Sequence, residues 1–471
     1  MPDLQVQNLG ALNQYINPLT QKPGDLIFAQ NVDSFPYGAK SKRIGYETFL
    51  GTVDGSSITR LFSWRKENGT TLFLYRASGT SLYYSAQGTG AWTACTTGGV
   101  TSTNFVDYAI LGDTLMICDG AGSTRHTTNG TAFTNTSLAP VTTSLAEYQR
   151  RIYGAGTSST MFYSTTNDAT NWNTSGTSDS SSFTIPGAGK LGKVFKQNDR
   201  LIAPKTSGLM FKWDGFSLID TATNLGPASP WSVSKSEDYS FWINRLGHYG
   251  YGGGKPQLLS NAVQRQFYNN AGSGVAGGTF DTMGAETHRF DYFMSLGTIT
   301  DDLTNITINN AILKYDYQKN EYLNWKFAHF PRSWHSYQDA NGVQQLIFGD
   351  NAGQVYKMSG TLMADAGSAI ESMMIFYIDG GVPHLDKKWD NYWFFLNPGN
   401  QIKIQIALSD TYVHSRLKWT ELGDASSGVL EGKFPQGSRS KFLFIKFYEA
   451  SLSSSFNLYG FTIKGEAIEP L

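Results

Sequence analysis

The feature that most constrains this chain is a hairpin cassette that recurs from about residue 57 onward. Each copy contains an apolar strand, a Gly-rich or polar turn, a second apolar strand, another turn and then an aromatic residue. The clearest copies are TLFLYRASGTSLYYSAQGTGAW, TLMICDGAGSTRHTTNGTAF, RIYGAGTSSTMFYSTTNDATNW and RLIAPKTSGLMFKWDGFSL. Their leading strands recur at roughly 40 to 50 residues, the spacing of four-stranded blades in a β-propeller.

One such blade has too little apolar surface to fold alone, whereas a closed ring buries every blade against its neighbours. We therefore predict an all-β protein in which residues 57–362 form a β-propeller of six or seven blades. A β-sandwich with irregular hairpins is the alternative architecture. The composition suits either all-β fold, because aromatic residues make up 14% of the chain, charged residues only 16%, and glycine is frequent.

The pattern changes after the Gly- and Ala-rich stretch near residue 363, where longer alternating strands begin. In QIKIQIAL, Ile402, Ile404 and Ile406 fall on one face and polar residues fall on the other. This period of two indicates half-buried antiparallel strands. Residues 363–471 are therefore predicted to form a C-terminal β-sandwich domain that folds on its own.

The first 56 residues show neither pattern. They are punctuated by Pro, Gly and Asn, which is typical of an extended segment rather than a domain. We predict that residues 1–56 form an N-terminal arm that becomes ordered on a neighbouring molecule.

No motif for enzymatic chemistry stands out. The seven histidines are scattered without a metal-binding spacing, and no GxSxG nucleophile elbow is present. The Gly-rich stretch GHYGYGGGK (247–255) lacks the register of a phosphate-binding loop and is expected to be a flexible blade loop. We therefore expect no catalytic residues, no cofactor and no metal ion, and no substitution that abolishes a chemical turnover.

The stretch STTNDATNW (164–172) resembles the Asp-box turn of sialidase-type propellers, although Thr170 replaces the expected glycine. That turn staples a hairpin and is remote from catalysis, so the resemblance supports the fold alone. A sialidase-like site would also need several arginines that converge near a carboxylate. The candidates for such a site are Arg60, Arg65, Arg76, Arg200, Arg245, Arg289 and Glu286. Their spacing does not show that they converge.

Charge and terminal sequence narrow the class of protein further. A net charge of −1 creates no global attraction to nucleic acid or to an anionic membrane. The first residues lack the pattern of a secretory signal, so we expect none, and no apolar run reaches the roughly 20 residues that a membrane-spanning helix needs. Cys95 and Cys118 are expected to be buried free thiols, because two cysteines make neither a disulfide framework nor a metal site.

The stretch AQNVDSFPYGAKSKRIGYETF (29–49), called the strap below, carries one compact basic cluster. It is too polar and too turn-rich to bury a core of its own, so we expect it to be mobile in the free chain. Its aromatic and basic residues are types that anchor an extended arm on a partner. The predicted assembly residues are Asn31, Asp33, Phe35, Tyr37, Lys40, Lys42, Arg43 and Tyr46.

The two ends of the chain carry four short elements. They are an Asn-Pro turn at Asn17 and Pro18, an Ala-x-Asn-x-Asp element at 29–33, a KRxGY element at 42–46 and the closing strand LYGFTIKGEAIEP at 458–470. In these elements the chain resembles propeller-containing bacteriophage tail proteins, most closely the nozzle proteins of short-tailed phages.

This resemblance implies a structural protein of the virion tail, assembled in the bacterial cytoplasm. Six copies would form a ring that continues the DNA conduit below the portal and adaptor and carries fibres. The implied partners are other copies of the chain, the head-to-tail adaptor, tail fibre or tip proteins, and genomic DNA that passes without sequence-specific binding or membrane insertion.

The alternative function is a propeller that binds or cleaves host glycans during attachment. Aromatic residues in the stretches NWNTSGTSDSSSF and HYGYGGGK would then stack against sugars. A soluble monomer that binds host polysaccharide would favour this alternative, whereas ring formation with an adaptor would favour the tail protein.

Overall fold

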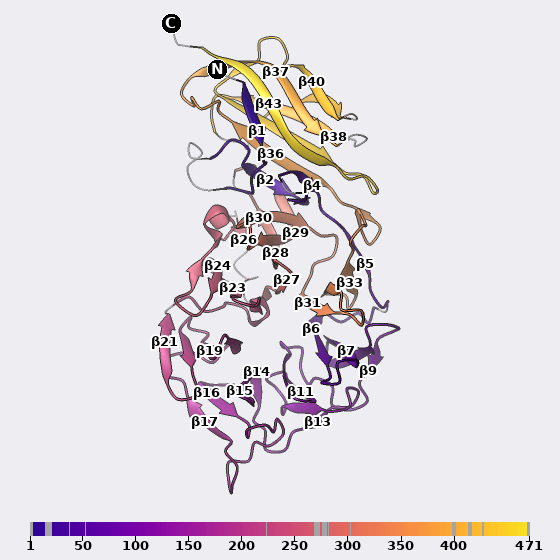
Figure 1. Ribbon diagram of the computed structural model, residues 1–471, viewed down its shortest axis with the longest axis vertical. Coiled ribbons are helices and arrows are strands. Elements are labelled where there is room, and N and C mark those ends of the chain that lie inside the picture. Colours follow the sequence, from indigo (N-terminus) through magenta and orange to yellow (C-terminus); the bar gives the residue numbers. More distant parts are fainter. Residues whose placement is uncertain are drawn as a thin grey trace.

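Strands joined by tight turns make up almost all of the computed structural model (Figure 1). Helical structure includes two short 3-10 segments, η2 (Pro230–Ser232) and η3 (Ser260–Gln266). The molecule is elongated, with a β-sandwich that contains both chain ends at the top of Figure 1 and a ring of sheets below it. The structure describes residues 3–14, 21–36, 38–51, 53–222, 224–267, 274–275, 280, 282–301, 303–397, 402–412, 417–425 and 428–468.

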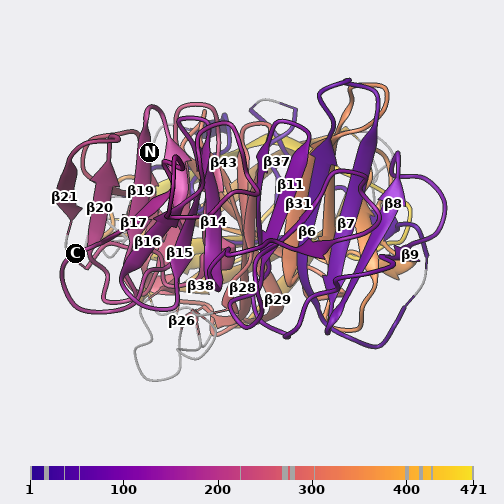
Figure 2. The same cartoon turned by 90° about the horizontal axis from the view of Figure 1, so that it is seen from below.

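The ring is a β-propeller, as predicted, and its described residues form seven blades. Blade 1 contains β6 (Ile58–Arg65), β7 (Leu72–Ser78), β8 (Ser81–Ala86) and β9 (Thr93–Ala94). Blade 2 contains β10 (Asp107–Leu111), β11 (Thr114–Cys118), β12 (Arg125–Thr127) and β13 (Thr134–Asn135). Blade 3 contains β14 (Thr142–Tyr148), β15 (Arg151–Gly156), β16 (Thr160–Tyr163) and β17 (Ser181–Thr184). Seen from below, β6 to β9 follow one another toward the right-hand side and β19 to β21 toward the left-hand side (Figure 2).

The remaining blades follow in chain order, and the last one takes a strand from the N-terminal region. Blades 4 to 7 contain β18 (Phe195–Gln197), β19 (Arg200–Pro204), β20 (Met210–Trp213) and β21 (Leu218–Ala222); β22 (Ser234–Lys235), β23 (Ser240–Asn244), β24 (Gly247–Tyr251) and β25 (Gln257–Leu258); β26 (Gly274–Val275), β27 (Ala285–His288), β28 (Asp291–Thr300), β29 (Thr307–Asp316) and β30 (Glu321–Lys326); and β31 (Ser333–Gln338), β32 (Gln344–Gly349), β33 (Val355–Met358) and β5 (Tyr46–Thr48).

Aromatic side chains fill the space between blades. Phe62 of blade 1 stacks on Tyr75 of the same blade and on Tyr108 of blade 2, with ring centroids 4.8 Å apart in both pairs. Such contacts repeat the burial of one blade face against the next, which explains why a chain so rich in Tyr and Phe forms this ring.

The ring is closed by the strap. β5 pairs antiparallel with β33, so that Tyr46 lies opposite Met358 and Thr48 lies opposite Tyr356. The hairpin β34 (Ala364–Asp365) and β35 (Ser368–Ala369) extends this sheet. Gly45 permits the close approach, because a Cβ atom there would lie 1.9 Å from the carbonyl oxygen of Ala364.

The second unit is a sandwich of two sheets. The first sheet contains β2 (Leu26–Gln30), β36 (Ser372–Ile378), β42 (Phe442–Glu449), β38 (Ile402–Ser409) and β39 (Thr420–Ala425). The second contains β3 (Val32–Asp33), β4 (Lys40–Lys42), β43 (Asn457–Ile468), β37 (Asp386–Leu396) and β40 (Val429–Lys433), with β1 (Leu4–Gln7) beside β43 and β41 (Arg439–Ser440) beside β37. Phenylalanines join the two sheets, with centroids 5.2 Å apart for Phe376 and Phe461 and 5.3 Å apart for Phe394 and Phe447.

This arrangement corrects the predicted arm at 1–56 and the self-contained domain at 363–471. β1 to β4 belong to the sandwich and β5 belongs to blade 7, so the propeller is inserted between two segments of the sandwich. The physical reason is strand pairing, because β36 and β43 find hydrogen-bonding partners in the N-terminal strands. The apolar run of β2 is wholly buried.

The sandwich also packs on the rim of the propeller. The backbone N–H of Asn31 donates to the carbonyl of Asn324 in β30 at 2.9 Å, and Trp325 Nε1 donates to the carbonyl of Val32 at 2.9 Å. These bonds join blade 6 to the strap where Figure 1 shows β30 beneath β2.

Two local predictions have different outcomes. The expected flexible loop at 247–255 is wrong, because its first five residues form the buried strand β24, in which Tyr249 and Tyr251 pack on Trp242. In the Asp-box-like stretch, Asp168 accepts a hydrogen bond from the Thr170 N–H at 2.9 Å, and this turn connects β16 to β17 as a hairpin staple would.

Candidate functional sites at the domain junction and the propeller axis

Most of the predicted assembly residues are buried within the chain itself. Asn31, Lys40, Lys42, Arg43 and Tyr46 expose between 0% and 2% of their surface. The expectation that these five wait on a mobile strap for a partner is therefore wrong, because each side chain already has partners in the sandwich or the propeller.

The other three predicted residues differ from these five. Asp33 is half-buried and forms an ion pair with Lys314 of β29, whose Nζ lies 2.8 Å from Asp33 Oδ1. Phe35 is 76% exposed and remains accessible to another molecule. Tyr37 lies outside the described residues.

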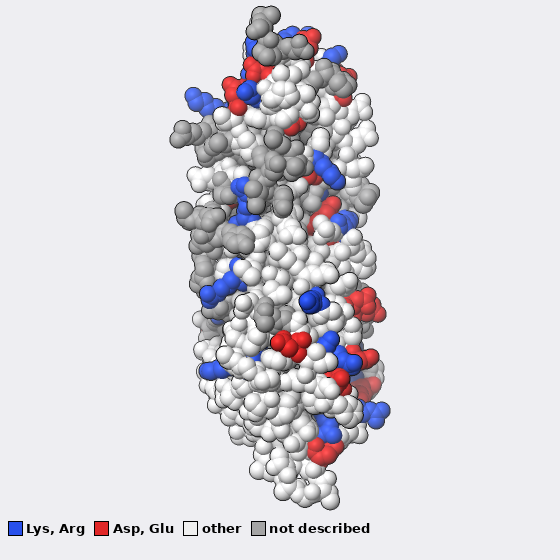
Figure 3. All heavy atoms as spheres, turned by 90° about the vertical axis from the view of Figure 1, so that its left-hand side faces the viewer, with Lys and Arg blue, Asp and Glu red and all other residues white. Residues whose placement is uncertain are grey.

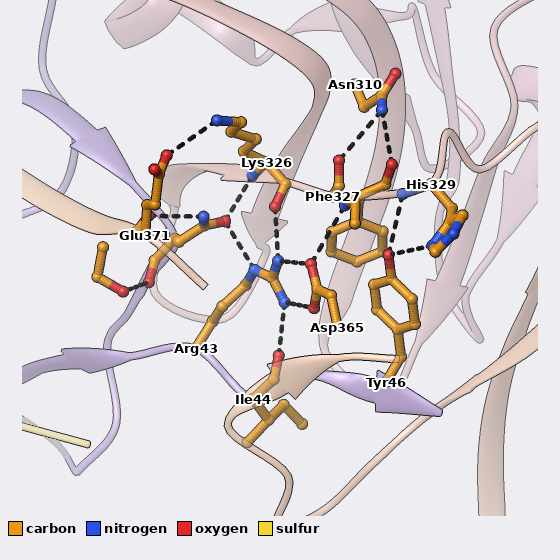
Figure 4. A network of polar contacts seen from close by, with 12 residues as sticks. Arg43, Ile44, Tyr46, Asn310, Lys326, Phe327, His329, Asp365 and Glu371 are labelled. Atoms are coloured by element: carbon orange, nitrogen blue, oxygen red, sulfur yellow. Dashed lines mark hydrogen bonds and ion pairs between the residues drawn. The ribbon is translucent and has the colours of Figure 1, made fainter. Parts of the chain in front are cut away.

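Arg43 is the centre of the junction (Figure 4). Its guanidinium group holds the Asp365 carboxylate in a two-pronged ion pair, with N···O distances of 2.8 and 2.6 Å. The remaining N–H groups donate to Asn31 Oδ1 at 2.8 Å and to the carbonyls of Ile44 at 2.9 Å and Lys326 at 2.6 Å. All five donors of the guanidinium group are thus satisfied inside the protein.

Asn31 connects the same network to both domains. Its Oδ1 accepts from Arg43 and from the backbone N–H of Lys326 at 2.6 Å, while its Nδ2 donates to the carbonyl of Glu371 at 2.8 Å. Its φ of 57° is a conformation that asparagine tolerates better than most residues. The Ala-x-Asn-x-Asp element therefore bridges the sandwich and the propeller.

The two lysines of the strap are similarly engaged. Lys42 Nζ lies 2.7 Å from Glu449 Oε2 and donates to the carbonyl of Ser451 at 2.6 Å. Lys40 Nζ donates to Ser34 Oγ at 2.5 Å, and burial lowers the pKa of Lys40. The basic cluster seen in the sequence is consequently not a surface patch.

Tyr46 anchors β5 in an aromatic cluster. Its ring lies 5.0 Å from Phe327, 4.9 Å from Phe348 and 5.2 Å from Tyr356, measured between centroids. Its hydroxyl lies 3.1 Å from His329 Nδ1 and accepts from the His329 backbone N–H, also at 3.1 Å.

Tyr46→Phe is expected to lower the free energy of unfolding by about 1 kcal/mol, because it removes the hydroxyl and keeps the ring. Tyr46→Ala should cost about 3–5 kcal/mol, since it also leaves a cavity beside blade 7. Urea unfolding followed by tryptophan fluorescence measures both. Equal losses from the two variants would contradict the view that the ring, more than the hydroxyl, anchors the closing strand.

A second candidate site is a cavity of about 350 Å³ on the propeller axis. Residues from the neighbourhood of the innermost strand of all seven blades line it. Its ionisable lining residues are Arg60, Tyr108, Glu147, Lys193, Lys196, Lys235, Glu286 and His335. Ring closure therefore gathers charges that are far apart in the sequence.

Burial changes the titration of several of these groups. Burial raises the pKa of Glu286, whose Oε1 accepts from Ser234 Oγ at 2.6 Å. Burial also lowers the pKa of His335 to about 3, and its Nε2 lies 2.8 Å from Ser63 Oγ. Lys193 forms a close ion pair with the buried Asp107.

A wider pocket of about 860 Å³ opens on one face, over blades 2 to 5. It includes Phe105, which contacts the half-buried Trp231 in an edge-on arrangement with centroids 4.9 Å apart. Phe105 precedes blade 2 and Trp231 precedes blade 5, on the far side of a seven-bladed ring, so their contact crosses the axis. Trp231 Nε1 donates to the carbonyl of Thr59 at 2.7 Å, which fixes this bridge to blade 1.

The arginines weighed for a sialidase-like site are spread over the molecule. Arg60 and Glu286 line the axial cavity, and Arg245 lines the wide pocket. Arg76 forms an ion pair with Asp54, with an N···O distance of 3.2 Å. The others lie elsewhere: Arg65 donates to backbone carbonyls, while Arg200 and Arg289 are exposed.

The structure also describes the two cysteines, the residue types that could bind a metal ion, and the helices. Cys118 is buried, Cys95 is partly exposed, and both are free thiols. Among the described residues, no three His, Cys, Asp or Glu side chains are grouped to hold a metal ion. Within the same part of the chain, no helix has the length and apolar character to cross a membrane.

Comparison with known proteins identifies the propeller. Residues 65–196 match the DUF6242 beta propeller domain, and no curated protein matches the chain. Solved structures that are similar include YCF48 from Cyanidioschyzon merolae, at 11% identity over 67% of this chain and 98% of that one, with a TM-score of 0.42. BamB from Moraxella catarrhalis is similar at 12% identity over 75% of this chain and 97% of that one, with a TM-score of 0.38. The family match and the seven sheets of the ring together identify the chain as a β-propeller protein.

Proposed function

We propose that this β-propeller protein is a structural component of a bacteriophage tail. Copies of it form a nozzle-like ring that extends the DNA conduit below the portal and adaptor and carries fibres. The observation that carries the proposal is the meeting of the two end motifs. Lys40 of the strap pairs with Leu458 and Ser41 pairs with Asn457, so the KRxGY region and the closing strand belong to one unit.

The junction suits a part that must withstand load. The chain passes from the sandwich to the propeller and later returns, and these two connections and the buried Arg43 network hold the sandwich against blades 6 and 7. In the proposed ring, the DNA passes between copies of the chain and not along the propeller axis, which Phe105 and Trp231 cross.

The side of the molecule offers surface for contact between copies. Figure 3 shows wide areas without charged residues on the face that carries blades 4 and 5 in Figure 1. Large apolar side chains are exposed in these blades: Phe216, Ile219, Tyr239 and Leu246. Low charge also suits a conduit, because a strongly basic lining would hold DNA through many phosphate contacts.

The glycan-binding alternative is weakened by burial of its proposed stacking residues. Trp172, Tyr249 and Tyr251 are all buried in the propeller, so their faces are not presented to a sugar. The wide pocket over blades 2 to 5 remains the place where a glycan would be sought.

Ring formation tests the proposal. Native mass spectrometry and electron microscopy of the purified chain, alone and with the adaptor of the same virion, should show closed rings. Phe216→Asp should lower the yield of rings several-fold and leave monomer unfolding unchanged, because this side chain is 91% exposed.

Leu138→Asp is the matched control, since Leu138 is also an exposed apolar residue but lies outside blades 4 and 5. A chain that stays monomeric with and without adaptor would contradict the proposed ring. Loss of rings in the control but not in the Phe216 variant would place the contact elsewhere.

A further inference from the structure

The axial cavity contains a buried cation that forms no direct ion pair with the described residues. Arg60 exposes only 8% of its surface, and its side chain lines the cavity from β6. Its Nε atom is buried and has no hydrogen-bond partner among the described residues. Within the same residues, no carboxylate oxygen lies within the 4.0 Å of an ion pair with Arg60.

The contacts of the Arg60 guanidinium group are aromatic. Its central carbon lies 5.1 Å from the Phe105 ring centroid and 5.9 Å from that of Tyr108. Rings stabilise a cation through their faces but accept no N–H···O hydrogen bonds. By comparison, the buried Arg43 satisfies all of its donors with oxygen atoms. Arg60 thus has a buried N–H donor without a hydrogen-bond acceptor in the described part of the chain. This is unfavourable unless another molecule supplies acceptor oxygens.

Two more cations lie against Phe105 and Trp231, the two rings that meet across the axis. Lys193 Nζ lies 5.8 Å from the Phe105 centroid, and the Arg332 guanidinium carbon lies 5.7 Å from the Trp231 centroid. Arg332 Nε is likewise buried without a hydrogen-bond partner in the described chain. Blades 1, 4 and 7 therefore each direct a positive charge toward one end of the axis.

The two carboxylates that line the cavity, those of Glu147 and Glu286, make their direct contacts with groups other than Arg60. Glu147 forms an ion pair with Lys196, with an N···O distance of 3.6 Å. Glu286 accepts hydrogen bonds from Ser234 and from the Thr287 N–H at 3.1 Å, and burial raises the pKa of Glu286 although the Arg60 charge acts to lower it. Neither group neutralises Arg60 by direct contact.

We infer that the axial cavity is a binding site for a small molecule with a carboxylate or phosphate group, held mainly by Arg60. A guanidinium fork matches the paired oxygens of such groups. The volume of about 350 Å³ fits a small molecule, and the Phe105–Trp231 bridge across the axis excludes a polymer threaded through the ring. This site is independent of the proposed tail function.

Inorganic phosphate is the probe for the test. The full chain is dialysed into a buffer free of oxyanions and titrated with phosphate at constant ionic strength, with calorimetry and thermal unfolding as readouts. Saturable binding and a rise in melting temperature are expected, because a ligand that binds only the folded state stabilises it. Sodium acetate, titrated in the same way, distinguishes a preference for carboxylates from one for phosphates.

Arg60→Met should weaken phosphate binding at least about tenfold. Without phosphate this variant should melt no earlier than the unmodified chain, because it removes an unpaired buried charge. A merely structural arginine would show the opposite, with early melting in phosphate-free buffer. Arg289→Gln, at an exposed position, is the matched control and should bind phosphate normally.

Arg60→Lys provides a second variant if the methionine variant does not fold. This variant keeps the positive charge but loses the paired N–H donors of the guanidinium group, so it should bind phosphate more weakly than the unmodified chain. The inference is overturned if neither phosphate nor acetate binds saturably to the unmodified chain, or if all Arg60 variants bind as it does.

Discussion

Deletion of residues 1–42 is expected to prevent the chain from reaching a stable native fold. The deletion removes β1 to β4 and with them the partners of β36 and β43. The buried apolar side chains that are lost are Val6, Leu9, Leu12, Leu26, Ile27, Phe28 and Val32. Each such side chain contributes about 1.5–3 kcal/mol, so their sum of about 10–20 kcal/mol is as large as the roughly 5–15 kcal/mol by which most proteins are stable.

Circular dichroism melts and gel filtration compare the truncated and full chains. The truncated chain should aggregate or melt at a much lower temperature. Residues 363–471 expressed alone should behave in the same way, because the edge of β36 and part of β43 would be unpaired and exposed.

A fusion that replaces the propeller by a short linker is the control. It joins residues 3–42 to 372–468, and the two segments lie close together, since Ser372 Oγ donates to the carbonyl of Asn31 at 2.9 Å. This fusion should unfold cooperatively. Cooperative unfolding of 363–471 alone, or an unchanged melt of the truncated chain, would show that the N-terminal strands are dispensable.

Arg43→Met is expected to lower the free energy of unfolding by about 3–5 kcal/mol, because it leaves the Asp365 carboxylate buried without its counter-ion. The variant also removes the Arg43 donor to the carbonyl of Lys326 and one of the two donors to Asn31 Oδ1. The double variant Arg43→Met/Asp365→Leu should recover part of this loss, since both charges are then absent. Urea unfolding of the four proteins in a double-mutant cycle gives the coupling free energy.

Lys326→Met is the matched control for this pair. Lys326 forms an ion pair with Glu371 at 3.0 Å in the same region, but both side chains are exposed. Its loss should cost less than about 1 kcal/mol. If the Arg43 variant were no less stable than this control, the buried pair would not be what holds the junction together. Because these measurements use the isolated chain, they separate folding from assembly.

Much of the fold could be predicted from local patterns. The hairpin cassette predicted the propeller, and alternation predicted the sandwich strand in which Ile402, Ile404 and Ile406 are all buried. These patterns are reliable because a strand places successive side chains on opposite faces, so burial of one face is recorded in neighbouring residues. The first 42 residues were harder to interpret, because their strands are short and β3 contains only two residues.

The candidate sites were outside the reach of local patterns. A compact run of basic residues normally lies in solvent, and the sequence alone predicted an accessible cluster at Lys40, Lys42 and Arg43. Their burial depends on Asp365 and Glu449, which lie more than 300 residues away along the chain, so no local signal could find it. The axial cavity is similar, because Arg60, Phe105 and Trp231 come from separate blades.

The sequence by itself thus determined the all-β class, the propeller and the strands of the sandwich after residue 363, since these follow from the spacing of apolar residues and turns. The tertiary structure decided that the N-terminal strands join the sandwich and that Arg43 pairs with Asp365. It also decided that Arg60 has no ion pair among the described residues. The physical reason is that the favourable energy of a buried charge comes from the groups around it, and ring closure and sheet pairing bring those groups from distant parts of the chain.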